Sequence, residues 1–575
     1  MTPPDTIAGA AAPADLKHPF RMHPLLRYLL ATLAALAWCA SLPPLSWSWS
    51  IWLAPALLHL ACLGWGDRRL WGIGIYFGLL LNTLNFSFLH HIQLLVPFGI
   101  GICYCGLTAL FCRLSGAYNE ALLWRDVTAP RAGILPMPSP RSVILGALGT
   151  TALFAALEWV RSWLWTGVPF ATLAVSQAEV PATLLSARVW GQSGLSLMIA
   201  LVSFSLSAAL GAWLLGRRDA RKAVASGLGL ALAAILAILA VAATYSPPKP
   251  DAKLQVRLVQ GMYLPLMGAT ADEEAQQLYE APRTYVQLSL KAGPKPELIV
   301  WPETPLPMDY FSDRRYFPEM HTYREAVVTT TSRAGCPMIF GTPSALPTPP
   351  GGYPLRYNSS VWVDAAGKKQ GLYSKVHTLP FGEYFPWRYL LPKSWHRKFE
   401  DMSGMGPSLS EGFVTNVFRP RADAAIGTPI CFESLFSDIS LQFRRQGADI
   451  LLVLSNDSWF KDSCGGARHA AHSALRAVEC GVPVMRCGTY GFTQVHGPDG
   501  QILAKLRAAD SSPFIRDALD VSVPYTRSAP STPWMRCPWA ADLLAGIGAL
   551  LVLIWLGYRW VLLRQARAKV LAKAI

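Results

Sequence analysis

The chain contains few charged residues for its length. Asp, Glu, Lys and Arg make up 15% of its 575 residues, whereas roughly 25% is usual in soluble domains. Hydrophobic residues make up 52%, which argues against a purely soluble protein and for a membrane protein. The formal net charge of +15 could suggest a nucleic-acid partner. However, the basic residues gather between apolar segments and at the two chain ends, which membrane orientation explains better. We therefore expect no nucleic-acid partner.

The 11 cysteines lack the spacing of a metal site or of a disulfide framework. None forms a Cys-x-x-Cys pair, and Cys103 and Cys105 lie within an apolar run. His469 and His472 have the i, i+3 spacing of a metal pair, but no third ligand is spaced to join them. We therefore predict no metal and no cofactor. The two histidines are expected at a helix surface or at the edge of the core.

Eight apolar runs approach the roughly 20 residues that a helix needs to cross a bilayer. They cover residues 25–42, 49–66, 70–89, 94–115, 143–160, 189–215, 223–245 and 540–563. The first run lacks a clear cleavage site, so we read it as a retained signal-anchor helix. Lys and Arg gather before the first run, after the second, fourth and sixth, and after the eighth. Because basic loops stay in the cytoplasm, seven spans before residue 246 would place the next segment on the outer side.

Segment 248–530 has the pattern of a different kind of domain. Short apolar runs typical of strands alternate with amphipathic helical stretches, which indicates a layered α/β domain. The expected strands are 254–260, 297–301, 337–341, 360–363, 424–430 and 450–455, and two expected helices are 270–292 and 466–480. The chain is thus divided into a membrane domain of about seven helices (1–247), an outer α/β domain (248–530), and a last membrane helix with a basic cytoplasmic tail (531–575).

Three expected strand ends in the outer domain carry reactive side chains. Glu303 follows an apolar strand that breaks at Pro302, Lys375 follows a second strand, and Cys431 ends a third. Sites in open α/β sheets are usually built at strand ends. A thiol is a poor nucleophile until it is ionised, and an adjacent base or cation can ionise it.

These residue types together predict acyl transfer through a thioester. Glu303 would accept the Cys431 proton and return it to a leaving group. Lys375 and the backbone N–H of Phe432 would stabilise the oxyanion of the tetrahedral intermediate. Taken singly, each signal has an ordinary structural explanation, such as a buried thiol, a turn carboxylate or a solvated lysine. The prediction rests on the ordered combination.

Four motifs link this combination to a known family. They read WPE at 301–303, YSKVHTLPFGEYFP at 373–386, ICFE at 430–433 and SNDSWF at 455–460. Together they resemble the nitrilase superfamily and, within it, the bacterial apolipoprotein N-acyltransferases. The resemblance implies a nitrilase-like αββα sandwich for the outer domain. It also implies a ping-pong reaction in which Cys431 takes an acyl chain from phosphatidylethanolamine or a similar phospholipid. The chain then passes to the diacylglyceryl-cysteine amine of an apolipoprotein, the last step of lipoprotein maturation.

The resemblance also assigns residues and a location. It makes Glu303, Lys375 and Cys431 the catalytic triad and Glu383 a second acid that orients Lys375. From their positions near these residues, we also expect five substrate-binding or pocket residues: Phe432, Glu433, Asn456, Trp459 and Phe460. The enzyme is expected to act as a monomer in the bacterial inner membrane, with its catalytic domain on the periplasmic side.

Several interpretations stay open at this level. Asn456, Asp457 and Trp459 fit a helix-capping turn as well as a pocket wall. The aromatic and basic stretch 387–398 favours the membrane headgroup region over a solvated loop, and Glu158 is expected to pair with Arg161. A membrane-tethered amidase acting on a small substrate would use the same triad. A transporter would need intramembrane charges or broken helices in several spans, and the sequence offers little of either.

Overall fold

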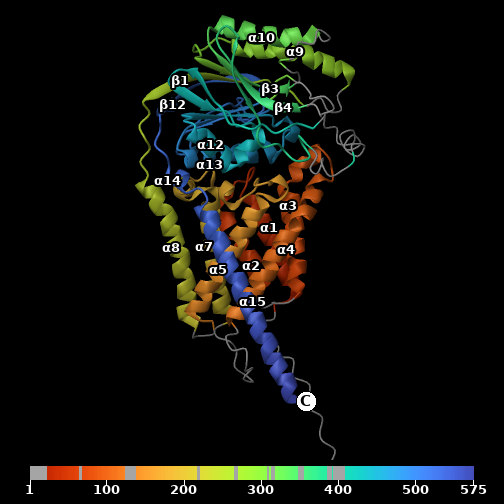
Figure 1. The fold of residues 1–575 in the computed structure, drawn as a ribbon, viewed down its shortest axis with the longest axis vertical. Helices are drawn as coiled ribbons and strands as arrows, with labels where there is room; N and C mark the ends of the chain where they lie inside the picture. The colour runs from red at the N-terminus through yellow and green to blue at the C-terminus, as the bar shows by residue number, and fades with distance from the viewer. Residues whose placement is uncertain are drawn as a thin grey trace, which may run out of the picture.

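The computed structural model describes residues 22–63, 68–123, 138–215, 220–264, 270–306, 310–311, 318–346, 355–384, 392 and 408–574. The stretch 387–398 lies outside these ranges apart from residue 392. A bundle of long helices and a layered α/β domain are stacked along the long axis of the molecule (Figure 1).

The bundle is built from the apolar runs of the sequence. Its helices are α1 (Pro24–Ala40), α2 (Ala54–Cys62), α3 (Arg69–Asn85), α4 (Val96–Leu123), α5 (Pro140–Arg161), α7 (Ala187–Leu215), α8 (Arg221–Thr244) and α15 (Ala540–Ala574). Each expected run overlaps one of them. Five described helices, α4, α5, α7, α8 and α15, are long and apolar enough to cross a membrane, whereas α1, α2 and α3 are shorter. The second and third runs are shorter as helices than predicted because 3-10 turns occupy Ser48–Trp52 and Ser87–His91.

The α/β domain contains two sheets with the same plan. In spatial order, the first sheet is β12 (Asp517–Tyr525), β1 (Ala252–Gln260), β2 (Leu298–Val300), β3 (Met338–Leu346), β4 (Leu355–Val363) and β5 (Lys369–Ser374). The second sheet is β11 (Ile502–Lys505), β10 (Gln494–His496), β9 (Val484–Gly488), β8 (Ile450–Ser455), β7 (Ala424–Gly427) and β6 (Val417–Arg421). In each sheet three neighbouring strands pair in parallel, β1–β2–β3 and β7–β8–β9, and the outer strands pair antiparallel.

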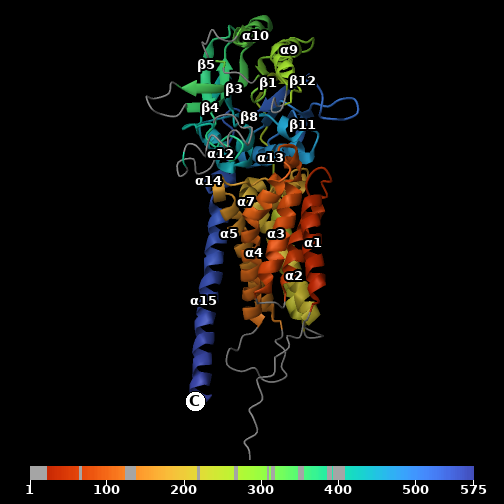
Figure 2. The same ribbon diagram turned by 90° about the vertical axis from the view of Figure 1, so that its right-hand side faces the viewer.

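The two sheets and the helices on their outer faces form four layers, because both faces of the central strands are apolar. Val256 of β1 and Leu452 of β8 belong to one buried core between the sheets. The other face of the first sheet carries Ile299, which packs with Tyr285 of α9 (Ala271–Ser289) and Val327 of α10 (Pro318–Ala334). The second sheet is covered by α12 (Ser437–Arg445) and α13 (Cys464–Cys480), on the side of the bundle (Figures 1 and 2). The domain is the predicted αββα sandwich.

Helix α13 joins the sandwich to the bundle. It begins after the cap residue Ser463 and ends at Gly481, whose positive φ of 66° gives a left-handed cap. Arg468 donates to the backbone oxygens of Pro43 and Asn85 in the bundle, both at 2.7 Å. The short helix α14 (Pro533–Arg536) lies at the same junction (Figures 1 and 2). Leu184 of the short helix α6 (Pro181–Leu184) packs in one core with Leu475 of α13. Buried hydrogen bonds of this kind fix the sandwich on the helical bundle.

Candidate active site

The three predicted catalytic side chains come together in the sandwich. Glu303 follows β2, Lys375 is the first residue after β5, and Cys431 lies beyond β7. The charges of Glu303 and Lys375 both act on the Cys431 thiol, and they act on each other. Residues that are far apart in the sequence therefore form one cluster of a carboxylate, an ammonium and a thiol.

Cys431 occupies a sharp turn rather than the end of a strand. The expected strand 424–430 is shorter than predicted, because β7 ends at Gly427 and only Ile430 makes a further single bridge, to Leu454. Cys431 starts a 3-10 turn and has a φ of 52°. A non-glycine residue with positive φ is strained unless its surroundings hold it, and such residues concentrate at functional sites.

Glu303 is almost completely buried, and hydrogen bonds from neighbouring groups hold it in place. Its Oε1 accepts a hydrogen bond of 2.7 Å from Asn358 Nδ2, and its Oε2 accepts one of 2.6 Å from the backbone N–H of Asn456. The Thr489 hydroxyl donates to the Glu303 backbone oxygen at 2.9 Å. These contacts fix the carboxylate beside Cys431, as a general base requires.

Glu383 forms an ion pair with Lys375, the residue that it is expected to orient. Its Oε2 lies 2.7 Å from Lys375 Nζ and also accepts the backbone N–H of Leu379 at 2.7 Å. Its Oε1 accepts a hydrogen bond of 2.9 Å from Asn358 Nδ2. Asn358 therefore donates to both Glu303 and Glu383 and holds the two carboxylates at a fixed separation.

The electrostatics of the cluster fit a proton relay. Burial raises the pKa of Glu303 above its usual value, against the opposing effect of Lys375. Burial and the neighbouring carboxylate of Glu303 hold the pKa of the Cys431 thiol well above its usual value. Burial acts to lower the pKa of Lys375, but Glu383, Cys431 and Glu303 together raise it. The resting site thus holds a neutral thiol, a carboxylate that is a stronger base than usual, and a permanent cation.

The carboxylate of Glu433 connects two segments of the site by hydrogen bonds. It is completely buried. Its Oε1 accepts hydrogen bonds from the Tyr373 hydroxyl at 2.7 Å and from the backbone N–H groups of Val376 at 2.7 Å and His377 at 3.1 Å. Its Oε2 accepts the Ile430 N–H at 2.7 Å. Glu433 therefore ties the segment that carries Lys375 to the turn that carries the nucleophile.

The other predicted pocket residues take different positions. Phe432 is buried, with its ring 5.2 Å from that of Phe436. The backbone N–H of Asn456 donates to Glu303, as expected for a pocket residue. The Asn456 side chain accepts the backbone N–H of Ser458, as expected for a capping turn. Both interpretations of Asn456 therefore apply. Trp459 is exposed. The ring of Phe460 meets that of Phe88 in the bundle edge to face at 5.0 Å, which places it at the junction with the membrane helices.

Two features of the site had no signal in the sequence. Asn358 is a polar residue inside β4, where nothing local marks it. His469 and His472 were expected at a helix surface or core edge, and that prediction is wrong because both rings are fully buried. Asp457, whose interpretation was open, is also buried and contacts His469 at 2.8 Å. The physical reason is that α13 is covered on two sides, by the sheet and by the bundle.

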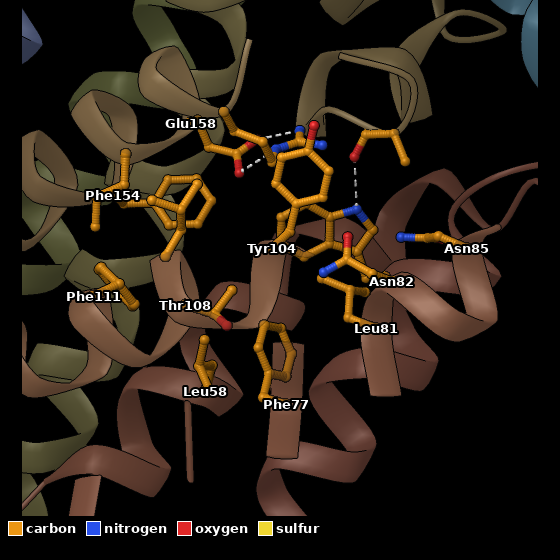
Figure 3. A pocket seen from close by; sticks show the side chains of 15 residues that line it. Leu58, Phe77, Leu81, Asn82, Asn85, Tyr104, Thr108, Phe111, Phe154 and Glu158 are labelled. Carbon is orange, nitrogen blue, oxygen red and sulfur yellow. Dashed lines mark hydrogen bonds and ion pairs between the residues drawn. The ribbon is translucent and has the colours of Figure 1, made fainter. Parts of the chain in front are cut away.

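A cavity inside the bundle lies apart from this cluster (Figure 3). Its volume is about 40 Å³, which leaves room for water but not for a lipid chain. Side chains of α1 to α5 line it, and no described lining residue belongs to the Glu303, Lys375 and Cys431 cluster. At its polar end, Glu158 accepts hydrogen bonds from Arg161 at 3.0 and 2.7 Å. The predicted pairing of these two residues is confirmed.

Comparison with known proteins agrees with both parts of the chain. The carbon-nitrogen hydrolase family model matches residues 256–515, and the model of the apolipoprotein N-acyltransferase N-terminal domain matches residues 34–205. The chain is similar to the apolipoprotein N-acyltransferase of Allorhizobium ampelinum, with 30% identity over 62% of this chain and 64% of that protein. It is also similar to that of Geobacter metallireducens, with 27% identity over 83% of this chain and 86% of that protein.

Among solved structures, an amidase from Nesterenkonia sp. aligns with 15% identity and a TM-score of 0.32, over 50% of this chain and 96% of the amidase. The alignment with the Allorhizobium protein spans just under two thirds of that relative, at 64% of its length. The two family models between them match most of the chain, the membrane helices as well as the sandwich. The chain is therefore similar to apolipoprotein N-acyltransferases over its helical bundle and to carbon-nitrogen hydrolases over its sandwich.

Proposed function

We propose that this chain transfers the sn-1 acyl chain of phosphatidylethanolamine, or of a similar phospholipid, to the N-terminal diacylglyceryl-cysteine of apolipoproteins. The observation that carries the proposal is the cluster of Glu303, Lys375 and Cys431 in a domain docked on apolar helices. A nucleophile held at a membrane surface can reach a phospholipid ester, which a soluble amidase has no need to do. Relatives that match the chain carry this activity in their names.

The first half-reaction loads the enzyme. Glu303 takes the proton from the Cys431 thiol, and the thiolate attacks the ester carbonyl of the phospholipid. The oxyanion that forms is stabilised by the Lys375 ammonium and the Phe432 backbone N–H. When the intermediate collapses, the C–O bond breaks and the proton on Glu303 passes to the glyceryl oxygen. The products are a lysophospholipid and a thioester on Cys431.

The second half-reaction unloads the acyl chain. The α-amine of the diacylglyceryl-cysteine attacks the thioester carbonyl, and Glu303 takes a proton from the attacking nitrogen. The oxyanion uses the same two donors. Collapse breaks the C–S bond, forms the amide, and returns the proton from Glu303 to Cys431. Because one carboxylate serves as base and then as acid in each half, its raised pKa suits both roles.

The location proposed for the reaction is the outer face of the bacterial inner membrane. Support comes from the distribution of Lys and Arg, which gather on one side of the apolar runs. With the short helices α1 to α3 counted as spans, seven helices precede the sandwich and α15 follows it. This division gives a membrane domain at 1–247, a catalytic domain at 248–530 and a final helix with a basic tail at 531–575. The proposed partners are the two lipid substrates and the bilayer, and the proposed unit is a monomer.

The test uses the purified full chain in nanodiscs that contain phosphatidylethanolamine. A synthetic diacylglyceryl-cysteine peptide with a free α-amine is added, and the same peptide with an acetylated amine is the control. The expected result is one extra acyl chain, in amide linkage, on the free peptide only. Release of free fatty acid without transfer, or release of ammonia from small amides with no reaction of the lipid, would contradict the proposal.

A further inference from the structure

The turn at Cys431 presents one peptide group whose orientation matters for catalysis. The carbonyl of Cys431 and the N–H of Phe432 belong to the same planar trans peptide, so they point in opposite directions. Among the described residues, none accepts a hydrogen bond from the Phe432 N–H. This N–H is therefore available to the reacting oxygen, and whatever holds the carbonyl also aims the N–H.

Two side chains hold that carbonyl. The Ser434 hydroxyl donates to the Cys431 oxygen at 2.8 Å, and His469 Nε2 lies 3.1 Å from the same atom. Ser434 belongs to the same short turn, whereas His469 comes from α13. Because the φ of Cys431 is 52°, the turn needs support from outside itself, and the α13 histidine supplies it.

His469 is in turn fixed by a buried ionic network. Its Nδ1 lies 2.8 Å from Asp457 Oδ1, and Asp457 Oδ2 lies 2.6 Å from Arg486 Nη2. The Ser455 hydroxyl donates to Asp457 Oδ1 at 3.1 Å. All these groups are buried. A buried network of this kind holds its members in one arrangement.

The His469 ring has polar neighbours at both nitrogens. Asp457 Oδ1 lies 2.8 Å and Arg486 Nη2 3.1 Å from Nδ1, and the Cys431 oxygen and Ser434 Oγ each lie 3.1 Å from Nε2. Burial acts to raise the pKa of Asp457, but Arg486 and His469 lower it to about 2, so this carboxylate is ionised. Burial and Arg486 lower the pKa of His469, and the Asp457 carboxylate and the Cys431 oxygen oppose that shift. A hydrogen-bond donor on the Cys431 carbonyl also polarises the peptide and strengthens its N–H as a donor.

We infer that His469 is a positioning residue of the oxyanion site. Held by Asp457 and Arg486, it orients and polarises the Cys431–Phe432 peptide so that the Phe432 N–H faces the developing oxyanion. This inference deepens the proposed function and rests on its thioester chemistry, but not on the identity of the lipid. It gives α13 a second role besides docking, because the same helix contacts both the bundle and the nucleophile.

The chain offers a matched control on the same helix. His472 is also fully buried, and its Nε2 contacts the Phe170 backbone oxygen of the bundle at 3.0 Å. Among the described residues, no hydrogen bond joins His472 to the Cys431 peptide. His469→Leu and His472→Leu therefore remove similar buried rings, and only the first one loosens the oxyanion peptide.

The experiment compares two reactions of Cys431 in the full chain. Acylation by an activated ester such as p-nitrophenyl acetate passes through an oxyanion, whereas alkylation by iodoacetamide does not. His469→Leu is expected to slow acylation by about 10- to 100-fold, less than the roughly 10²- to 10³-fold cost of removing an oxyanion donor outright. The alkylation rate should be unchanged. His469→Gln, whose amide nitrogen can take the place of Nε2, should recover much of the acylation rate, and His472→Leu should leave both rates unchanged.

Three outcomes would overturn the inference. The first is that His469→Leu slows acylation and alkylation equally, and the second is that it slows neither reaction. The third is that His472→Leu slows acylation as much as His469→Leu does. If His469→Leu does not fold, Ser434→Ala removes the other donor to the same carbonyl and must slow acylation selectively. The activated ester separates this test from the proposed function. A wild-type chain that reacts with the ester but not with phosphatidylethanolamine would refute the lipid substrate and leave the His469 comparison intact.

Discussion

Replacing Asn358 with Leu should change the pH dependence of acylation more than its maximal rate. Asn358 Nδ2 donates to Glu303 Oε1 at 2.7 Å and to Glu383 Oε1 at 2.9 Å. The hydrogen bond to Glu303 stabilises its carboxylate and lowers its pKa, against the effect of burial. A hydrogen bond to a charged group is worth about 1.5–3 kcal/mol, and about 1.4 kcal/mol corresponds to one pH unit. Losing it should therefore move the acid limb of the rate profile upward by about 1–2 pH units.

The sign follows from the role of Glu303 as base. Only the ionised carboxylate accepts the Cys431 proton, so activity falls as the pH drops through the pKa of Glu303. Raising that pKa moves the fall to higher pH. The assay is single-turnover formation of the Cys431 thioester, followed by intact mass across the pH range.

Ser360→Ala is the control for this substitution. Ser360 lies on the same strand and pairs with the Thr428 hydroxyl at 2.7 Å, and neither partner is a carboxylate. The acid limb of the Ser360→Ala rate profile should therefore coincide with that of the wild type. An Asn358→Leu profile that is lowered equally at every pH, with its acid limb unmoved, would refute the reasoning and reduce Asn358 to a structural role.

Three further substitutions test other parts of the site. Lys375→Gln should slow thioester formation by at least about 10²-fold, because a charged oxyanion donor is lost, while lipid binding measured by fluorescence titration stays unchanged. Glu433→Gln should destabilise the folded chain by about 1–3 kcal/mol, because its amide faces backbone N–H donors. Burial raises the pKa of Glu433 to about 7, so wild-type melting temperature should fall as the pH rises toward 7, a trend that the Gln variant should lack. Arg468→Gln removes two donors to bundle carbonyls and should lower the melting temperature, whereas the same change at exposed Arg445 should not.

The elements that could be predicted from the sequence are those with a local signal. A long apolar run indicates a helix because the bilayer sets its length, and each expected run overlaps a helix. Glu303 lies just after the apolar strand Leu298–Val300, a pattern that is visible in a short window. Lys375 follows the mostly polar strand Lys369–Ser374, and its motif rather than its polarity pattern singled it out. The turn at Cys431 was read as a strand end because Thr428-Pro-Ile continues the apolar pattern after Gly427, although the ladder stops there.

The elements that could not be predicted depend on what surrounds them. Asn358 contacts a carboxylate 55 residues away in the sequence, and a polar residue in a strand carries no mark of that contact. Helix α13 has a polar face that includes Arg468 and His469. On a helix that is covered on one side only, this face would lie in water. Here the sheet lies on one side and the membrane bundle on the other, so both faces are buried. The role of His469 follows only when both layers are known.

The central claim is that Cys431 carries an acyl chain from a phospholipid, and intact mass spectrometry tests it most directly. The purified chain is incubated with phosphatidylethanolamine of one defined acyl composition and without an acceptor amine. The expected result is a mass increase of one acyl group, mapped to Cys431, removed by hydroxylamine and absent from Cys431→Ala. A wild-type chain that gains no acyl group, or an equal gain in Cys431→Ala, would contradict the account.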